Sequence, residues 1–169
     1  MVGSAIMYLV EPIDDLRERL YEQAALWQLA REVRQEALVR LACDALVGGQ
    51  DSPGVVRLAG MSVQGQDHDF EEAVAAALSD LGVALPAQAS TEAQVGAARA
   101  MSRLVIGGEL SPRELARWAH VRIGHSGASE VQALVELDDA YDTAEYINRQ
   151  PADLDREILA EARRLLLNG

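Results

Sequence analysis

Hydrophobic positions recur at helical spacing along most of the chain. Between residues 12 and 46, apolar side chains first follow one helical face and then a rotated one. Such a drifting stripe predicts either one long helix packed on two sides or two helices with a bend near residue 30. Only residues 5–10 carry the alternation of a strand, so at most a short extended N-terminal segment is expected. The pattern therefore predicts an all-α protein.

Capping residues mark where the other helices begin and end. The clearest signal is Ser111–Glu114, a hydroxyl cap followed by proline at the first helical position and glutamate at the third. Gly124 should end that helix, and Asp69 and Thr91 are the expected caps of two earlier ones. Together with Pro and Gly positions, these signals predict helices over residues 53–59, 69–81, 91–106, 112–123, 128–147 and from 151 onward. We expect a compact bundle of about six or seven helices, forming a single domain over residues 1–169.

Composition fits such a domain. The chain has 169 residues, of which 49% are hydrophobic and 25% charged, the range of ordinary globular proteins. A single cysteine, Cys43, excludes an internal disulfide and is expected to be a small packing residue. The apolar runs fall far short of the about 20 residues that a membrane span needs, and residues 5–10 lack the basic flank of a signal peptide. A cytoplasmic protein without membrane contact is therefore expected.

The net charge limits the classes of partner that the protein is expected to bind. All 15 basic residues are arginine, and 27 acidic residues give a net charge of −12, which argues against nucleic-acid binding. Residues 130–161 hold ten acidic side chains against Arg149 and Arg156. A concentrated negative field would attract a basic protein partner, although acidity that serves only solubility is the alternative. The arginine-only basic set and the abundant alanine are typical of a bacterium with a GC-rich genome.

A helical wheel places carboxylates on the inward side of the helix predicted over 128–147. Asp138 and Glu145 share the apolar arc with Tyr141, and Asp142 lies at its edge. On the preceding helix, Arg122 falls among the inward residues. We therefore expect Arg122 to face this carboxylate cluster.

Three interpretations of the cluster remain open. The first is a structural ion pair between Arg122 and Asp138, because an unpaired buried charge is costly. The second is a polar pocket in which Asp138, Asp142 and Glu145 bind a hard cation or a cationic ligand. The third is a solvated acidic stripe.

Metal ligation is a further alternative for the same helices. His120 and His125 are separated by five positions across a helix stop, whereas zinc-binding helices space their histidines by four and add a glutamate. With Asp138 and Asp142 they are nevertheless candidate ligands. We expect instead that His125 caps the helix end. The acidic group at residues 67–72 is explained as a helix start.

The sequence contains no cofactor-binding motif and no nucleophile with an adjacent base. The Gly124–Gly127 segment is one residue too short for a nucleophile elbow. The leading hypothesis is a non-enzymatic interaction module that binds a basic protein, such as an adaptor, a regulator or a toxin-neutralising immunity-like protein. One alternative is a metal-dependent or acid-base enzyme with its site between the helices over 112–123 and 128–147. Another is a bundle that binds a small ligand in a pocket lined by Trp118 and Tyr141.

Overall fold

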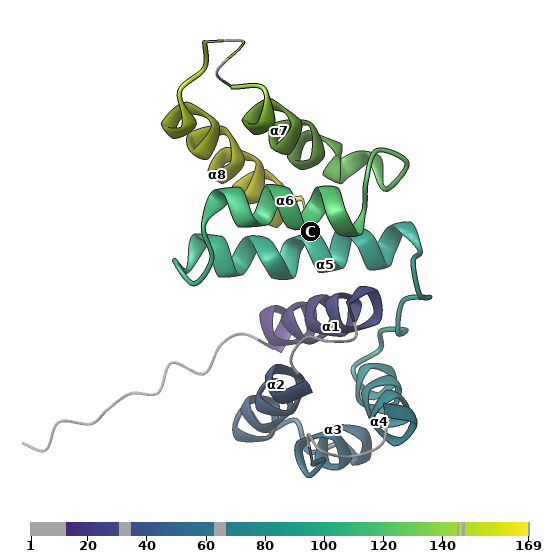
Figure 1. Cartoon of the computed structure of the whole chain (residues 1–169). Helices are drawn as coiled ribbons and strands as arrows, with labels where there is room; N and C mark the ends of the chain where they lie inside the picture. Colours follow the sequence, from purple (N-terminus) through teal and green to yellow (C-terminus); the bar gives the residue numbers. More distant parts are fainter. Residues whose placement is uncertain (1–12, 31–34, 63–66, 145, 147, 169) are drawn as a thin grey trace, which may run out of the picture. The chain divides into compact units, whose positions relative to one another are not determined.

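The computed structural model describes residues 13–30, 35–62, 67–144, 146 and 148–168, and these residues form only helices and their connections (Figure 1). The predicted extended segment at residues 5–10 lies outside them. The helices are α1 (Ile13–Leu29), α2 (Gln35–Val47), α3 (Pro53–Ala59), α4 (Asp67–Asp80), α5 (Thr91–Ile106), α6 (Pro112–Arg122), the 3-10 helix η1 (Ser129–Val131), α7 (Gln132–Asp142) and α8 (Pro151–Leu167). The all-α prediction is confirmed. The described residues hold eight α-helices, more than the six or seven expected, because the drifting stripe is divided into α1 and α2.

The described helices belong to two compact units. Unit 1 contains α2, α3, α4 and α1 up to Leu20, and unit 2 contains the rest of α1 and α5 to α8. The prediction of one domain stays a prediction, because two compact units can share one cooperative fold. No helix in the described parts of the chain is long and apolar enough to cross a membrane.

Unit 1 depends on a close approach of α3 to α4. A Cβ atom at Gly54 would lie 2.5 Å from the carbonyl carbon of Ala76, so only glycine lets the two backbones come this near. The Gly54 amide also donates to Asp80 Oδ2 at 2.7 Å. Val55, Leu58 and Phe70 are completely buried in this unit.

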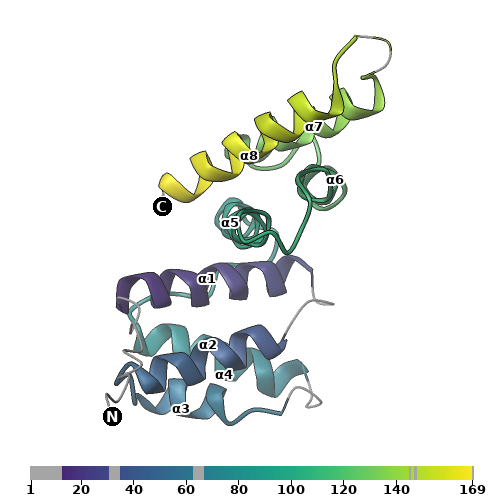
Figure 2. The same cartoon turned by 90° about the vertical axis from the view of Figure 1, so that its left-hand side faces the viewer.

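Unit 2 is built from two crossed pairs of helices. Figure 2 views α5 and α6 nearly end-on, whereas α7 and α8 run across the view. Their core is aliphatic and includes Leu115, Leu134, Leu154 and Ile158. Arg99 fastens the end of α8 by donating to the carbonyl oxygen of Leu165 at 3.0 Å. This packing holds α7 between α6 and α8, so its two flanks carry the site residues described below.

The capping signals were mostly located correctly, but some boundaries differ. Ser90, one residue before the expected Thr91, caps α5 by accepting from the Ala93 amide at 3.1 Å. Helix α4 starts at Asp67, two residues before the expected Asp69. Helix α7 ends at Asp142, well before residue 147. It stops there because the chain turns back: Arg149 N donates to the Ala144 carbonyl at 3.0 Å, and α8 then packs against α7.

Candidate metal centre

The segment that carries the site is fixed at both ends of α6. Ser111 and Glu114 form the predicted capping box, in which the Ser111 amide donates to Glu114 Oε2 at 2.8 Å. The hydrogen bond from the Ser111 hydroxyl, and after it the bond from the Ser111 amide, lower the pKa of Glu114. Gly124 ends the helix as predicted, in the left-handed conformation with φ +68°. His120 therefore lies in the last turn of α6 and His125 directly after its stop.

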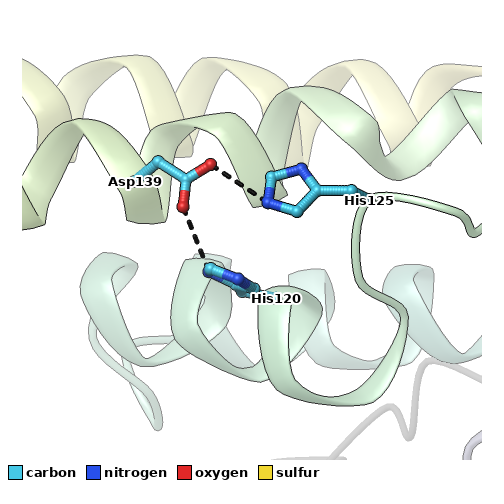
Figure 3. A group of neighbouring side chains, drawn as sticks. All are labelled: His120, His125 and Asp139. Atoms are coloured by element: carbon cyan, nitrogen blue, oxygen red, sulfur yellow. Dashed lines mark ion pairs between the residues drawn. The ribbon is translucent and has the colours of Figure 1, made fainter.

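Helix α7 then brings two adjacent carboxylates to these histidines. His120 Nδ1 lies 3.0 Å from Asp138 Oδ2 and 3.5 Å from Asp139 Oδ1. His125 Nε2 lies 3.3 Å from the other oxygen of Asp139, Oδ2. Figure 3 shows Asp139 on α7 facing both imidazole rings, whose centroids are 5.1 Å apart in a T-shaped arrangement. One carboxylate thus faces two histidines from separate elements.

Burial separates the roles of the two aspartates. The Asp138 side chain is only 11% exposed. When the Nδ1 atom of His120 carries a proton, this N–H donates to the Asp138 carboxylate. Asp139 is 46% exposed and lies at the solvent-facing side of the group. Both aspartates approach the same ring nitrogen of His120, Nδ1, whereas the usual outer partner of a metal-binding imidazole bonds the nitrogen that does not hold the metal.

The donor atoms are nearly close enough to share one ion. One ligand atom each from His120, His125 and Asp139 lies within 4.8 Å of the others. Ligands about 2.0–2.1 Å from a tetrahedral metal lie about 3.3 Å from one another. The histidine–aspartate distances of 3.5 and 3.3 Å are close to this value, but they end on different oxygens of Asp139. Only a small closure of the group would be needed, and His125, which is 59% exposed, has room to move.

The position of Arg122 differs from the one expected. Arg122 is the last residue of α6 and is exposed, so its predicted inward orientation is wrong. The inward positions at this end of α6 belong to Ala119 and the half-buried Ile123. Arg113, near the start of α6, contacts α7: it lies 4.6 Å from the centre of the Tyr141 ring and 3.7 Å from Asp142 Oδ1.

The other members of the predicted cluster have separate surroundings. Tyr141 is buried, and its hydroxyl donates to Asp155 and to the Pro151 carbonyl, which ties α7 to α8. Burial first, and then the hydrogen bond and charge of Asp155, raise the pKa of Tyr141 to about 12. Trp118 is half-buried against the core of unit 2. Glu145 lies outside the described residues.

A groove lies on another side of α7, between this helix and α8. It has a volume of about 360 Å³ and shares no residue with the histidine–aspartate group. Neither Trp118 nor Tyr141 lines it, so this groove is not the pocket expected for a small ligand. Its lining residues are Ala133, Glu136, Leu137, Ala140, Arg149, Glu157 and Glu161.

Sequence reasoning identified His120, His125 and Asp138 as candidate ligands but missed Asp139. A signal was present, because two consecutive aspartates on a helix point about 100° apart, so that one can be buried while the next faces its edge. Asp142, the other expected ligand, is exposed and pairs with Arg113 instead. Comparison of the chain with protein-family models, curated proteins and solved structures finds no match. Function must therefore be argued from the geometry itself.

Proposed function

We propose that unit 2 binds one divalent transition-metal ion, with Zn²⁺ as the best fit, through His120, His125 and Asp139. The observation that carries this proposal is the convergence of the three donor atoms within 4.8 Å. The ligands come from the last turn of α6, the following turn and the middle of α7. Random surface acidity does not supply two imidazoles to one carboxylate.

The donor types favour zinc over the common hard cations. Ca²⁺ and Mg²⁺ prefer six or more oxygen ligands, whereas two imidazole nitrogens and one carboxylate suit Zn²⁺ and its neighbours. Asp138 Oδ2 lies 3.0 Å from the same His120 Nδ1, so its carboxylate would add a second negative charge next to the ion. A bound ion would link the end of α6 to α7, so it should also stabilise the fold.

Three protein ligands leave one tetrahedral position for water. This composition is that of catalytic zinc sites, in which the metal lowers the pKa of its bound water toward neutrality. The metal-dependent enzyme hypothesis therefore has a chemical basis at this site, and hydrolysis is the reaction class that such a ligand set would support. Metal binding is the property to test first.

The test is calorimetric titration of the metal-stripped, full-length protein with Zn²⁺. We expect one ion per chain, and at a Zn²⁺ concentration of 100 times Kd a gain in unfolding free energy of about 2.7 kcal/mol. His120→Ala and Asp139→Ala should each weaken binding by about 100-fold, because two remaining ligands hold zinc poorly. Circular dichroism would verify that both variants are folded.

The chain provides a matched control in His68, its only other histidine. His68 is 81% exposed and pairs with Glu72 on its own helix, at 3.3 Å. His68→Ala removes the same imidazole and should leave the Zn²⁺ affinity unchanged. Absence of Zn²⁺ binding in the parent protein, or an equal loss in His68→Ala, would overturn the proposal.

A further inference from the structure

The groove between α7 and α8 combines an apolar wall with a row of carboxylates. Ala133, Leu137 and Ala140 occupy one face of α7 at helical spacing and are partly exposed there. Glu157 and Glu161, one turn apart on α8, line the opposite side. An apolar surface next to paired carboxylates suits a long side chain with an aliphatic stem and a cationic head.

The charge of the groove is not balanced within it. Three glutamates line it against a single arginine, Arg149. Glu161 is only 13% exposed and pairs with Arg164, which lies outside the groove lining. Glu136, by contrast, is exposed and makes no hydrogen bond or ion pair in the described part of the chain. The Glu136 carboxylate is therefore available to bind a cationic group of another molecule.

Arg149 shows which cation the groove accepts. It comes from the segment between the two helices, and its Nη2 donates to Glu157 Oε1 inside the groove lining. Its side chain is 32% exposed, so this guanidinium is held at the surface rather than built into the core. The protein thus already places one guanidinium against a carboxylate of this groove.

We propose that the groove binds an arginine side chain from a basic, arginine-rich segment of a partner protein, and that Arg149 competes with it from within the chain. The planar guanidinium can bond two carboxylate oxygens at once, which a lysine ammonium cannot do with the same geometry. This site gives the basic-partner hypothesis a location. It is independent of the metal site, with which it shares no residue.

The experiment measures binding of a fluorescein-labelled peptide in which arginines alternate with glycine and serine. The control peptide carries citrulline, the neutral isostere, at every arginine. At low salt the full-length protein should bind the arginine peptide and not the citrulline peptide. Glu136→Gln should weaken binding by about fivefold, the size expected for one exposed charge pair.

Two further variants separate this groove from the general acidity of the protein. Asp51→Asn makes the same charge change at an exposed position of unit 1 and should alter binding by less than about twofold. Arg149→Ala removes the internal competitor and should tighten binding by about threefold. Equal binding of the citrulline peptide, or equal effects of Glu136→Gln and Asp51→Asn, would overturn the groove as the site. Weaker binding by Arg149→Ala would overturn the competing role of Arg149.

Discussion

The α3–α4 region of unit 1 and the α6–α7 region of unit 2 contain similar residues but use them differently. Both have a Ser-Pro helix start, a histidine near several acidic residues and a closely packed helix pair. In α4, His68 meets Glu72 four residues later on one exposed helix, with the two side chains 81% and 53% exposed. In α6–α7, His120 meets a buried aspartate from another helix.

This difference teaches that a dense acidic sequence does not by itself make a site. Residues 67–72 hold four carboxylates in six positions, a higher density than in α6 and α7, yet the described residues form a three-ligand group only at His120, His125 and Asp139. Neighbours along one helix diverge toward solvent, whereas ligands from two packed helices are aimed at one point and held there.

The prediction with the largest expected effect concerns the unfolding free energy and the close packing of α3 and α4. Gly54→Ala places a methyl group 2.5–2.7 Å from backbone atoms of Ala76 and Ala77, so α3 and α4 must separate. We expect a loss of about 3 kcal/mol in urea unfolding, the upper part of the range for overpacking.

Gly60→Ala is the control for that substitution. A Cβ atom there would be 3.6 Å from its nearest neighbour, and φ is −87°, so the loss should be below about 1 kcal/mol. Under native conditions neither variant should change the Zn²⁺ affinity. A reduced Zn²⁺ affinity in both variants would show that the geometry of the α6–α7 site depends on the α3–α4 region.

The next effect concerns the buried carboxylate. Asp138→Asn keeps the shape of the side chain but removes the negative charge 3.0 Å from His120 Nδ1, and we expect the Zn²⁺ affinity to fall by about tenfold because that charge attracts the ion. The matched change in α4 is Glu72→Gln beside His68, which should leave the affinity unaltered. If calorimetry gives the same Zn²⁺ affinity for the two variants, the buried Asp138 carboxylate has no larger effect on metal binding than the exposed Glu72 carboxylate.

The smallest effect compares the two Ser-Pro starts. Ser111 accepts from the Glu114 amide at 3.3 Å, whereas Ser52 makes no capping bond with its side chain. Ser111→Ala should cost about 1 kcal/mol, and Ser52→Ala only a few tenths, measured by thermal unfolding near neutral pH.

Acid should reduce the difference between these two serine variants. The pKa of Glu114 is lowered in the folded protein by its bonds to Ser111. A depressed pKa means that the capping box contributes stability above the ordinary pKa of glutamate and loses it as the pH falls through the lowered value. The cost of Ser111→Ala should therefore shrink in acid, while that of Ser52→Ala should stay constant. A cost for Ser111→Ala that does not change with pH would contradict this account.

Much of the site could be anticipated, but not its arrangement. The sequence pointed to His120, His125 and Asp138 on neighbouring helices, because periodicity and the Gly124 stop locate each residue along its own element. It misassigned Arg122, since a wheel drawn for a whole helix does not reveal which side of its last turn is covered. It missed Asp139 because this residue points about 100° away from the inward Asp138, to the edge of the covered face, where the wheel does not show contact with the next element.

The sequence by itself determined the helical class and most helix starts and stops, including the box at Ser111 and the turn at Gly124. These features depend on contacts between residues three or four positions apart, which any reader of the chain can locate. Only the tertiary structure decided that His120 and His125 share Asp139, and that the acidic residues of α8 face the apolar side of α7. Those contacts depend on how far each helix is rotated against its neighbour, a quantity set by the packing of both faces at once.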